Sequence, residues 1–197
     1  PRVRPVSAAA SSAAKDDELV FALTLGLDWT ARTARRTLQE RAAEGRDMTA
    51  AREALFRLFG DGPLRGNARD KDILAPDDVI RVRAMLCLAS MDALDDGWLV
   101  KQLSDKDEHV RKWAVRLLAD EDFVAKDAAD AAKVSAALKQ LAAKESSGLV
   151  QLYLASALNR MPLSDRWDIA ESLASSDKFE ADNMLPLMIW YGIEPAV

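Results

Sequence analysis

The sequence has few residues that build metal sites or disulfides: its 197 residues include one cysteine, Cys87, and one histidine, His109. A single cysteine forms no intrachain disulfide, and these two residues cannot supply a Cys-rich metal site. Long apolar runs are also missing, because no stretch reaches the roughly 20 residues that a membrane-spanning helix needs. We therefore exclude a disulfide scaffold and expect no metal, no cofactor and no membrane insertion.

Glycine and proline are scarce as well, with 8 and 7 copies, whereas alanine and leucine are abundant. Alanine and leucine favour helix, because their side chains lose little rotamer freedom there. Few stretches alternate apolar and polar residues as a half-buried strand does. With 49% apolar and 30% charged residues, the composition is that of an ordinary globular protein. We predict an all-α fold.

Charge is spread unevenly along the chain. Residues 28–71 hold 10 Lys/Arg against 7 Asp/Glu, and residues 72–197 hold 14 against 22. A nucleic-acid-binding protein usually carries a dense basic face, so the acidic larger part disfavours that class. The arginines at positions 32, 35, 36 and 41 have the spacing of one to two faces of a helix. They could contact phosphates, but a solvated face or ion pairs to acidic neighbours is the commoner outcome.

The two ends of the chain differ in character. The first residues, PRVRPVSAAASSAAK, are rich in Ala, Ser and Pro, and we expect residues 1–14 to form a disordered tail or linker. Residues 15–197 are expected to form a single helical domain, which is long enough to bury a core. Because the chain does not begin with Met, we expect it to be a fragment of a longer protein.

The segment DKDEHVRKWAVRLLAD, residues 105–120, has the pattern of an amphipathic helix. Asp105 is placed to cap it, and Glu108 stands three residues on, close to a capping box. The apolar stripe consists of Val110, Trp113, Ala114, Leu117 and Leu118.

The same stripe returns twice, 28 residues before and 40 residues after this one. The earlier copy is Val82, Met85, Leu86 and Ala89, and the later one is Val150, Tyr153, Leu154, Ala157 and Leu158. One amphipathic helix pair cannot bury its apolar face alone, but stacked pairs can. The predicted architecture is an α-α superhelix, a HEAT-like solenoid of about five irregular helix pairs.

Candidates for chemistry have simpler structural interpretations. Cys87 lies in an apolar segment with no adjacent base, so we expect a buried thiol rather than a nucleophile. His109 has no second ligand at metal spacing, and we expect it at the surface. The carboxylate clusters at 77–78, 95–96 and 120–123 lack the spaced ligands and the glycine of a calcium loop. We expect them to cap helices, and we predict no catalytic, cofactor-binding or metal-binding residue.

Five tryptophans are a rich supply for this length. Trp113 falls on a helix stripe and is expected in the core. Trp167, Trp190 and Tyr191 lie near the end of the sequence, where a solenoid without a cap exposes apolar surface. Aromatic side chains are favoured anchors at protein interfaces. These three residues are the predicted partner-binding site.

Several segments resemble a known family. VIRVRAMLCLA and VRKWAVRLL look like HEAT repeats. LDWTARTARRTLQERAAEG, SGLVQLYLASALNRMPLSDRW and NMLPLMIWYGIEPAV resemble the HEAT-repeat region of large exported planctomycete and verrucomicrobial proteins, the membrane-bound dehydrogenase or haem-binding proteins. The resemblance covers roughly residues 27–45 and 76–197, and LPLMIWYGIEP is its most specific part.

In that family a sugar-dehydrogenase-like β-propeller precedes the repeats, and a c-type cytochrome domain with a CxxCH haem site usually follows. This chain has no CxxCH, so no haem or redox role carries over to any of its residues. The resemblance implies a periplasmic or exported location, an oxidoreductase as the parent protein, and a segment that spaces or docks redox domains.

Together these observations predict a non-catalytic HEAT-like scaffold or docking module, whose partners are proteins or neighbouring domains of the same chain. The alternative is a HEAT-like nucleic-acid-binding enzyme of the DNA glycosylase type, which needs a continuous basic concave surface containing aromatic and carboxylate groups. A third class, enzymes resembling bilin lyases, also uses HEAT-like repeats, but nothing in the sequence marks a pigment pocket.

Overall fold

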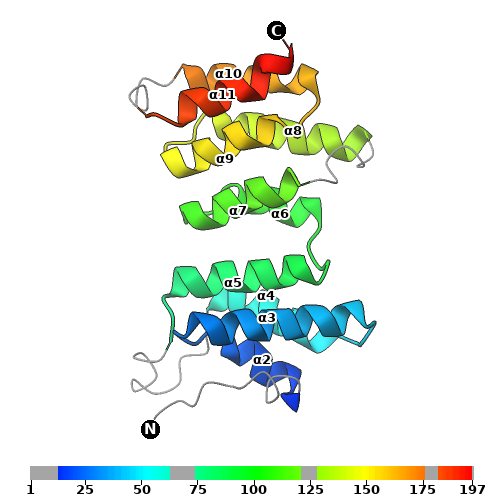
Figure 1. The fold of residues 1–197 in the computed structure, drawn as a ribbon. Coiled ribbons are helices and arrows are strands. Elements are labelled where there is room, and N and C mark those ends of the chain that lie inside the picture. Colours follow the sequence, from blue (N-terminus) through cyan, green and yellow to red (C-terminus); the bar gives the residue numbers. More distant parts are fainter. Residues whose placement is uncertain (1–12, 63–73, 121–127, 176–181, 197) are drawn as a thin grey trace. The chain divides into compact units, whose positions relative to one another are not determined.

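The fold is taken from a computed structural model that describes residues 13–62, 74–120, 128–175 and 182–196 (Figure 1). Within these ranges the chain forms helices joined by loops, and its only β-type pairing is an isolated bridge between Leu25 and Leu74. The predicted all-α fold is confirmed. Most of the predicted tail, residues 1–12, lies outside the described residues.

The helices fall into two compact units, Pro1–Leu94 and Asp95–Val197. The first unit contains α2 (Asp16–Ala22), α3 (Asp28–Ala43), α4 (Thr49–Asp61) and α5 (Asp77–Ser90). The second contains α6 (Asp96–Gln102), α7 (Glu108–Leu118), α8 (Ala128–Ala142), α9 (Gly148–Leu158), α10 (Leu163–Ala174), α11 (Leu185–Ile193) and the short 3-10 helix η4 (Glu194–Ala196).

Within each unit, helix packs on helix. In the first unit α2 packs on α3 and α4 packs on α5. In the second unit α9 lies between α7 and α11, and α10 packs on both α9 and α11. These contacts agree with an α-α arrangement. That residues 15–197 form a single domain stays a prediction.

Helix α7 begins two residues later than its sequence indicates. The N-cap is Asp107, whose side chain accepts a hydrogen bond from the His109 amide at 2.8 Å. The predicted cap, Asp105, instead accepts the Asp107 amide at 2.9 Å. Aspartates bond readily to a backbone amide two residues on, so two aspartates in this spacing first close a turn and then start the helix.

Helices α7, α9 and α11 repeat one pattern of cap and burial. The side chains of Asp107, Ser147 and Asp182 each accept a backbone amide at the start of their helix. Counted from that residue, the positions at +3 and +7 are at most 8% exposed in all three helices. They are Val110 and Ala114, Val150 and Leu154, and Leu185 and Ile189. The predicted stripes of α7 and α9 are confirmed at these positions, while Trp113 and Tyr153 are only half-buried.

The predicted stripe of α5 is wrong in register. Of its four residues only Met85 is buried, and the other three are half-buried. The buried face consists of Ile80, Ala84, Met85, Cys87 and Leu88. The prediction aligned the Val-Arg pair at 82–83 with that at 110–111. In α5 the buried residue that precedes an arginine is Ile80 and not Val82. The equivalent positions in α5 and α7 are therefore Ile80 and Val110, which are 30 residues apart instead of the predicted 28.

The first buried residues of α5, α7 and α9 are Ile80, Val110 and Val150. The residue that follows each of them has the same role in all three helices. Arg81, Arg111 and Gln151 each donate a side-chain hydrogen bond to a carbonyl at the end of the preceding helix or in the loop after it. The acceptors are the carbonyls of Phe59 at 3.1 Å, Asp105 at 2.8 Å and Glu145 at 2.9 Å. The last carbonyls of a helix, like that of Phe59, and the carbonyls of loop residues, like those of Asp105 and Glu145, have no partner within a helix, and these side chains supply the missing donors.

Arg111 also forms an ion pair with Glu145, in the loop between α8 and α9. Its Nε and one terminal nitrogen donate to the two carboxylate oxygens at 2.7 and 2.9 Å. The Glu145 side chain is only 3% exposed, and the amides of Ser146 and Ser147 donate to the same carboxylate. Burial acts to raise the pKa of Glu145, but the Arg111 and backbone hydrogen bonds outweigh it, and the pKa is lowered overall.

We expect Glu145→Gln to lower the free energy of unfolding by about 1.5–3 kcal/mol at pH 7, the range for a hydrogen bond to a charged group. A carboxylate whose pKa is lowered on folding stabilises the protein above its unfolded pKa of about 4.3, and this is lost as pH falls through the folded pKa. The difference between wild type and variant should therefore shrink below about pH 4.

Urea denaturation followed by circular dichroism at several pH values measures this difference. Glu53→Gln is the matched control, because its 4.0 Å pair with Arg57 is exposed and is worth about 0–1 kcal/mol. A loss no greater than that of the control would show that the buried pair does not support the loop.

Candidate functional site

The most unusual surface of the described chain lies on α10 and α11. The sequence of α11, LPLMIWYGI, contains no charged residue. Six large apolar side chains on or beside these two helices are 45–56% exposed. We call them the C-terminal face: Leu163, Trp167, Met184, Leu187, Trp190 and Tyr191. In α11, Leu187, Trp190 and Tyr191 are three and four residues apart and so share one side of the helix. Clustered exposed apolar side chains mark interaction sites more often than isolated ones do.

The repeat pattern shows which part of α11 is uncovered. The position at +8 from the capping residue is Val115 in α7, Ala155 in α9 and Trp190 in α11. Val115 and Ala155 are completely buried, whereas Trp190 is 48% exposed. The same helix arc is therefore covered in α7 and α9 and open in α11, where it carries the largest side chain.

Two close contacts hold α11 in place beneath this surface. A Cβ atom added at Gly192 would lie 2.6 Å from the Cβ of Leu158, so only glycine allows α11 to approach α9 this closely. The buried Arg166 of α10 donates to the carbonyl of Gly192 at 2.7 Å and to that of Met161 at 2.9 Å. The exposed side chains of α11 thus stand on a firmly packed helix.

The three predicted partner-binding residues all belong to this face. Trp167 lies on α10, while Trp190 and Tyr191 lie on α11, which packs on α10. Their binding role stays a prediction. Sequence reasoning missed Leu187 and Met184, which are 49% and 56% exposed, although the lack of charge in α11 was a signal for them.

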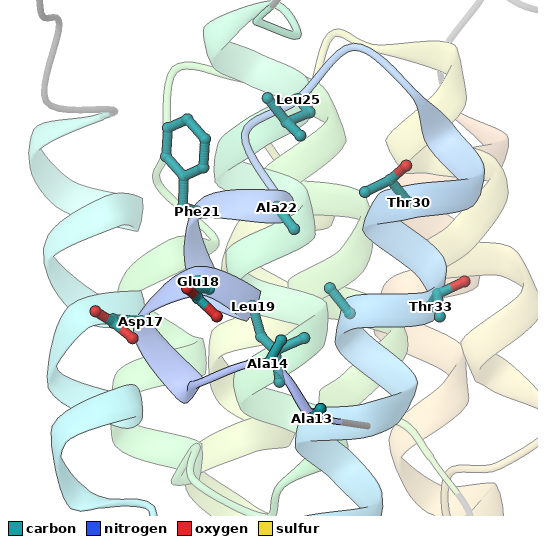
Figure 2. A pocket seen from close by; sticks show the side chains of 11 residues that line it. Ala13, Ala14, Asp17, Glu18, Leu19, Phe21, Ala22, Leu25, Thr30 and Thr33 are labelled. Carbon is teal, nitrogen blue, oxygen red and sulfur yellow. The ribbon is translucent and has the colours of Figure 1, made fainter. Parts of the chain in front are cut away.

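A second apolar surface, on the first unit, was not predicted. Phe21, Leu27 and Trp29 are 48–57% exposed there. Phe21 also lines an open groove of about 720 Å³ formed by α2, α3 and the segment before α2 (Figure 2). Small side chains make up much of its lining: Ala13, Ala14, Ala22, Thr30, Thr33 and Ala34. In Figure 2 Phe21 stands at one end of the groove and Ala13 and Ala14 at the other.

A smaller pocket of about 330 Å³ lies between α2 and α4. Its lining combines apolar side chains such as Val20 and Leu58 with the charged side chains of Asp17, Arg57 and Asp61. No group of three or more His, Cys, Asp or Glu residues suited to a metal ion occurs among the described residues.

The residues weighed for chemistry occupy structural positions. His109 is exposed in the first turn of α7, and Cys87 is fully buried, which raises the pKa of its thiol to about 12. Asp95 caps α6 by accepting the Trp98 amide. Of the cluster at 120–123 only Asp120 is described, and it pairs with Arg160 at 2.8 Å.

Three of the four arginines of α3 form ion pairs with acidic neighbours. Arg32 pairs with Asp28 at 2.6 Å and Arg36 with Glu40 at 2.8 Å, both one turn apart on the same helix. Arg41 is buried and pairs with Asp16 of α2. Ion pairing, the commoner outcome expected from the sequence, is what these three arginines show.

The chain matches no model of a known protein family, no curated protein and no solved structure. The resemblance noted from the sequence accordingly stays a prediction.

No helix in the described ranges combines the length and apolarity that crossing a membrane requires.

The Gly192 contact generates a prediction. Gly192→Ala should lower the free energy of unfolding by about 1–3 kcal/mol, because the added methyl group forces α11 away from Leu158. Thermal unfolding monitored by circular dichroism measures the effect. Gly60→Ala in α4 is the matched control: nothing lies within 4 Å of its added Cβ, so helix propensity should give a gain of up to about 1 kcal/mol. Equal stability of the Gly192 variant and wild type would mean that the close approach is no constraint.

Proposed function

We propose that this chain is a non-catalytic, HEAT-like helical scaffold that docks a protein, or a neighbouring domain of its own parent protein, on the C-terminal face. The anchors are Trp167, Trp190 and Tyr191, together with Leu187. The scaffold role explains why the described residues carry stacked helices and caps but no constellation of catalytic groups.

One observation carries the proposal. Trp190 occupies the repeat position at which Val115 and Ala155 are completely buried, yet it is 48% exposed. Burying a large aromatic side chain releases about 25 cal/mol for each Å² of apolar surface removed from water. An exposed tryptophan in this position is therefore a strong anchor for a partner that completes the packing.

The support beneath the face favours binding as well. Gly192 and Arg166 fix α11 against α9 and α10, so α11 does not have to be ordered when a partner arrives. Association loses less conformational entropy when the binding surface is rigid beforehand.

The nucleic-acid alternative receives less support. Three of the four arginines that could contact phosphates, Arg32, Arg36 and Arg41, are paired with carboxylates. α10 adds Asp165 and Glu171, together with Asp168, which pairs with Lys139 of α8 at 3.0 Å, and α11 adds no positive charge. A face of this kind repels phosphate and suits a protein partner.

The finer parts of the proposal rest on the sequence resemblance alone. They are that the partners are redox domains, which the scaffold spaces or docks, and that the setting is periplasmic or exported. The same resemblance implies an oxidoreductase as the parent protein, with this segment contributing architecture rather than chemistry.

Quantitative affinity capture with the whole chain tests the proposal. The chain is immobilised and exposed to an extract of the source cells, and the bound proteins are compared for wild type, Trp190→Glu, Leu187→Glu and the control Gln140→Glu. Gln140 is exposed on α8, outside the face, and takes the same added charge. We expect at least one protein to be retained by wild type and control and to bind the two face variants at least about 30-fold more weakly, as for a hot-spot residue worth about 2 kcal/mol.

An identical set of bound proteins for all four chains would refute docking at this face. Salt-sensitive binding of duplex DNA by wild type, measured by fluorescence anisotropy, would favour the nucleic-acid alternative instead.

A further inference from the structure

Helices α7, α9 and α11 share a second side, which the core does not cover. The positions at +2, +5, +6 and +9 from the capping residues Asp107, Ser147 and Asp182 have the spacing of one side of a helix. None of the side chains at these positions is buried. We call them the α7–α9–α11 surface: His109, Lys112, Trp113 and Arg116, then Leu149, Leu152, Tyr153 and Ser156, then Met184, Leu187, Met188 and Tyr191.

These positions form one surface because the three helices lie side by side in register. α7 packs on α9 and α9 packs on α11, and in Figure 1 all three run in the same direction. The starts of α7 and α9 are joined by the Ser147 hydroxyl, which donates to the Glu108 carboxylate. The last turns of α9 and α11 meet at Leu158 and Gly192. Equal positions therefore follow one another across the three helices.

Charge on this surface is confined to α7. The sequences of α9 and α11, GLVQLYLASAL and LPLMIWYGI, contain no charged residue. On α7, Arg111 is bound to Glu145, but Lys112 and Arg116 have no carboxylate partner within the described part of the chain. The surface thus has two open positive charges along one edge and apolar side chains across the rest.

Lys112 is held where the charged edge meets the apolar part. Its ammonium nitrogen lies 5.9 Å from the centre of the Trp113 ring and 5.6 Å from that of Tyr153 on the next helix. Aromatic faces attract a cation, so the two rings restrict where the ammonium group lies. The rings are neutral and leave its positive charge uncompensated. A carboxylate that arrives from a partner therefore gains a charge-assisted hydrogen bond from a donor already in place.

We infer that the α7–α9–α11 surface binds an acidic amphipathic segment of a partner protein. The apolar side chains of the segment cover α9 and α11, with Leu152 and Leu187 as central contacts. Its Asp and Glu side chains pair with Lys112 and Arg116 at the α7 edge. The inference rests on the proposed function, since Leu187 and Tyr191 also belong to the C-terminal face, and it adds the chemical class of the partner.

The distribution of charge selects this class of partner. A nucleic-acid strand laid across the surface would place phosphates over α9 and α11, which offer no cation. A basic segment would meet Lys112 and Arg116 and no acidic residue of the surface. An acidic segment with apolar side chains is complementary to both parts, because apolar burial supplies affinity and charge pairing fixes the orientation.

Selection of peptides on the immobilised full chain gives the first test. The probe is a display library of random peptides of about 16 residues, which as helices of about 24 Å span three helices spaced about 8–10 Å apart. We expect the enriched peptides to combine Asp or Glu with large apolar residues more often than the starting library does. Enrichment of peptides without this acidic bias, or no enrichment, would overturn the inference.

Variants of the chain then separate the charged edge from the apolar part. Fluorescence anisotropy with the most enriched peptide should show binding at least about 10-fold weaker for Arg116→Glu and for Leu187→Glu. The matched control is Lys101→Glu, which reverses an exposed cation on α6, outside the surface, and should bind as wild type does. Circular dichroism checks that the helices of each variant are intact.

An altered peptide shows whether the carboxylates themselves meet Arg116. When every Asp and Glu of the peptide is replaced by Asn and Gln, wild type should bind it at least about 10-fold more weakly, and Arg116→Glu should cause no comparable further loss. Raising the salt from about 0.05 to about 0.5 M should weaken the acidic peptide more than the amide one. Equal affinity of wild type and Arg116→Glu for the acidic peptide would overturn the inference.

Two other ligands give outcomes that reassign the surface. Single-stranded DNA of about 20 nucleotides that binds wild type more tightly than the enriched peptides do, and is weakened by Arg116→Glu, would make it a nucleic-acid site. The same result with vesicles containing phosphatidylglycerol would make it a membrane-binding surface. Either result would overturn the inference.

Failure of this inference is distinguishable from failure of docking in general. If affinity capture from the extract is lost with Leu187→Glu and Trp190→Glu but unchanged with Arg116→Glu, the C-terminal face docks a partner without acidic chemistry, and only this inference fails. If Leu187→Glu and Trp190→Glu change neither the captured proteins nor the binding of the enriched peptide, both proposals fail.

Discussion

The ion pair between Arg111 and Glu145 joins three helices of the second unit, because it connects α7 to the loop between α8 and α9. Arg111 lies on α7. It donates to the carbonyl of Asp105 in the loop before its own helix and pairs with the carboxylate of Glu145 in the loop before α9. Glu145 in turn accepts the amides of Ser146 and Ser147 just ahead of α9. The underlying constraint is general: carbonyl groups at helix ends and in the loops between helices have no partner within a helix and need donors. This chain supplies such donors near the starts of α5, α7 and α9, from Arg81, Arg111 and Gln151.

Helix α11, which carries most of the C-terminal face, is held in position by contacts of the same kind. Arg166 of α10 connects α11 to the rest of the unit, because it donates to the carbonyl of Met161 in the turn before α10 and to that of Gly192 in α11. Gly192 lets α11 sit close against Leu158. The rigid edge that results can present tryptophan and tyrosine to a partner at little entropic cost, and this connects the packing of the unit to its proposed docking role.

The proposed scaffold role agrees with the structural use of many polar groups. The arginines Arg32, Arg36 and Arg41 pair with carboxylates, Arg83 binds the carbonyls of Leu23 and Leu25, and Asp95 and Asp107 cap helices. Apart from Val79, the exposed large apolar side chains of the described residues lie in two places: near α2 and α3 in the first unit, and on or beside α10 and α11 in the second.

The sequence by itself determined the helices, the amphipathic stripes of α7 and α9, and the buried state of Cys87, because helix propensity and a period of 3.6 residues are local properties. It misplaced the cap of α7 and the register of α5, since neighbouring aspartates and repeated Val-Arg pairs offer several local solutions of similar quality. Only the tertiary structure decided that Trp113 is half-buried while Trp190 is exposed, and that Arg81, Arg111 and Gln151 share one task. Whether a side chain is covered, and which carbonyl it meets, depends on a neighbouring helix that lies far away in the sequence.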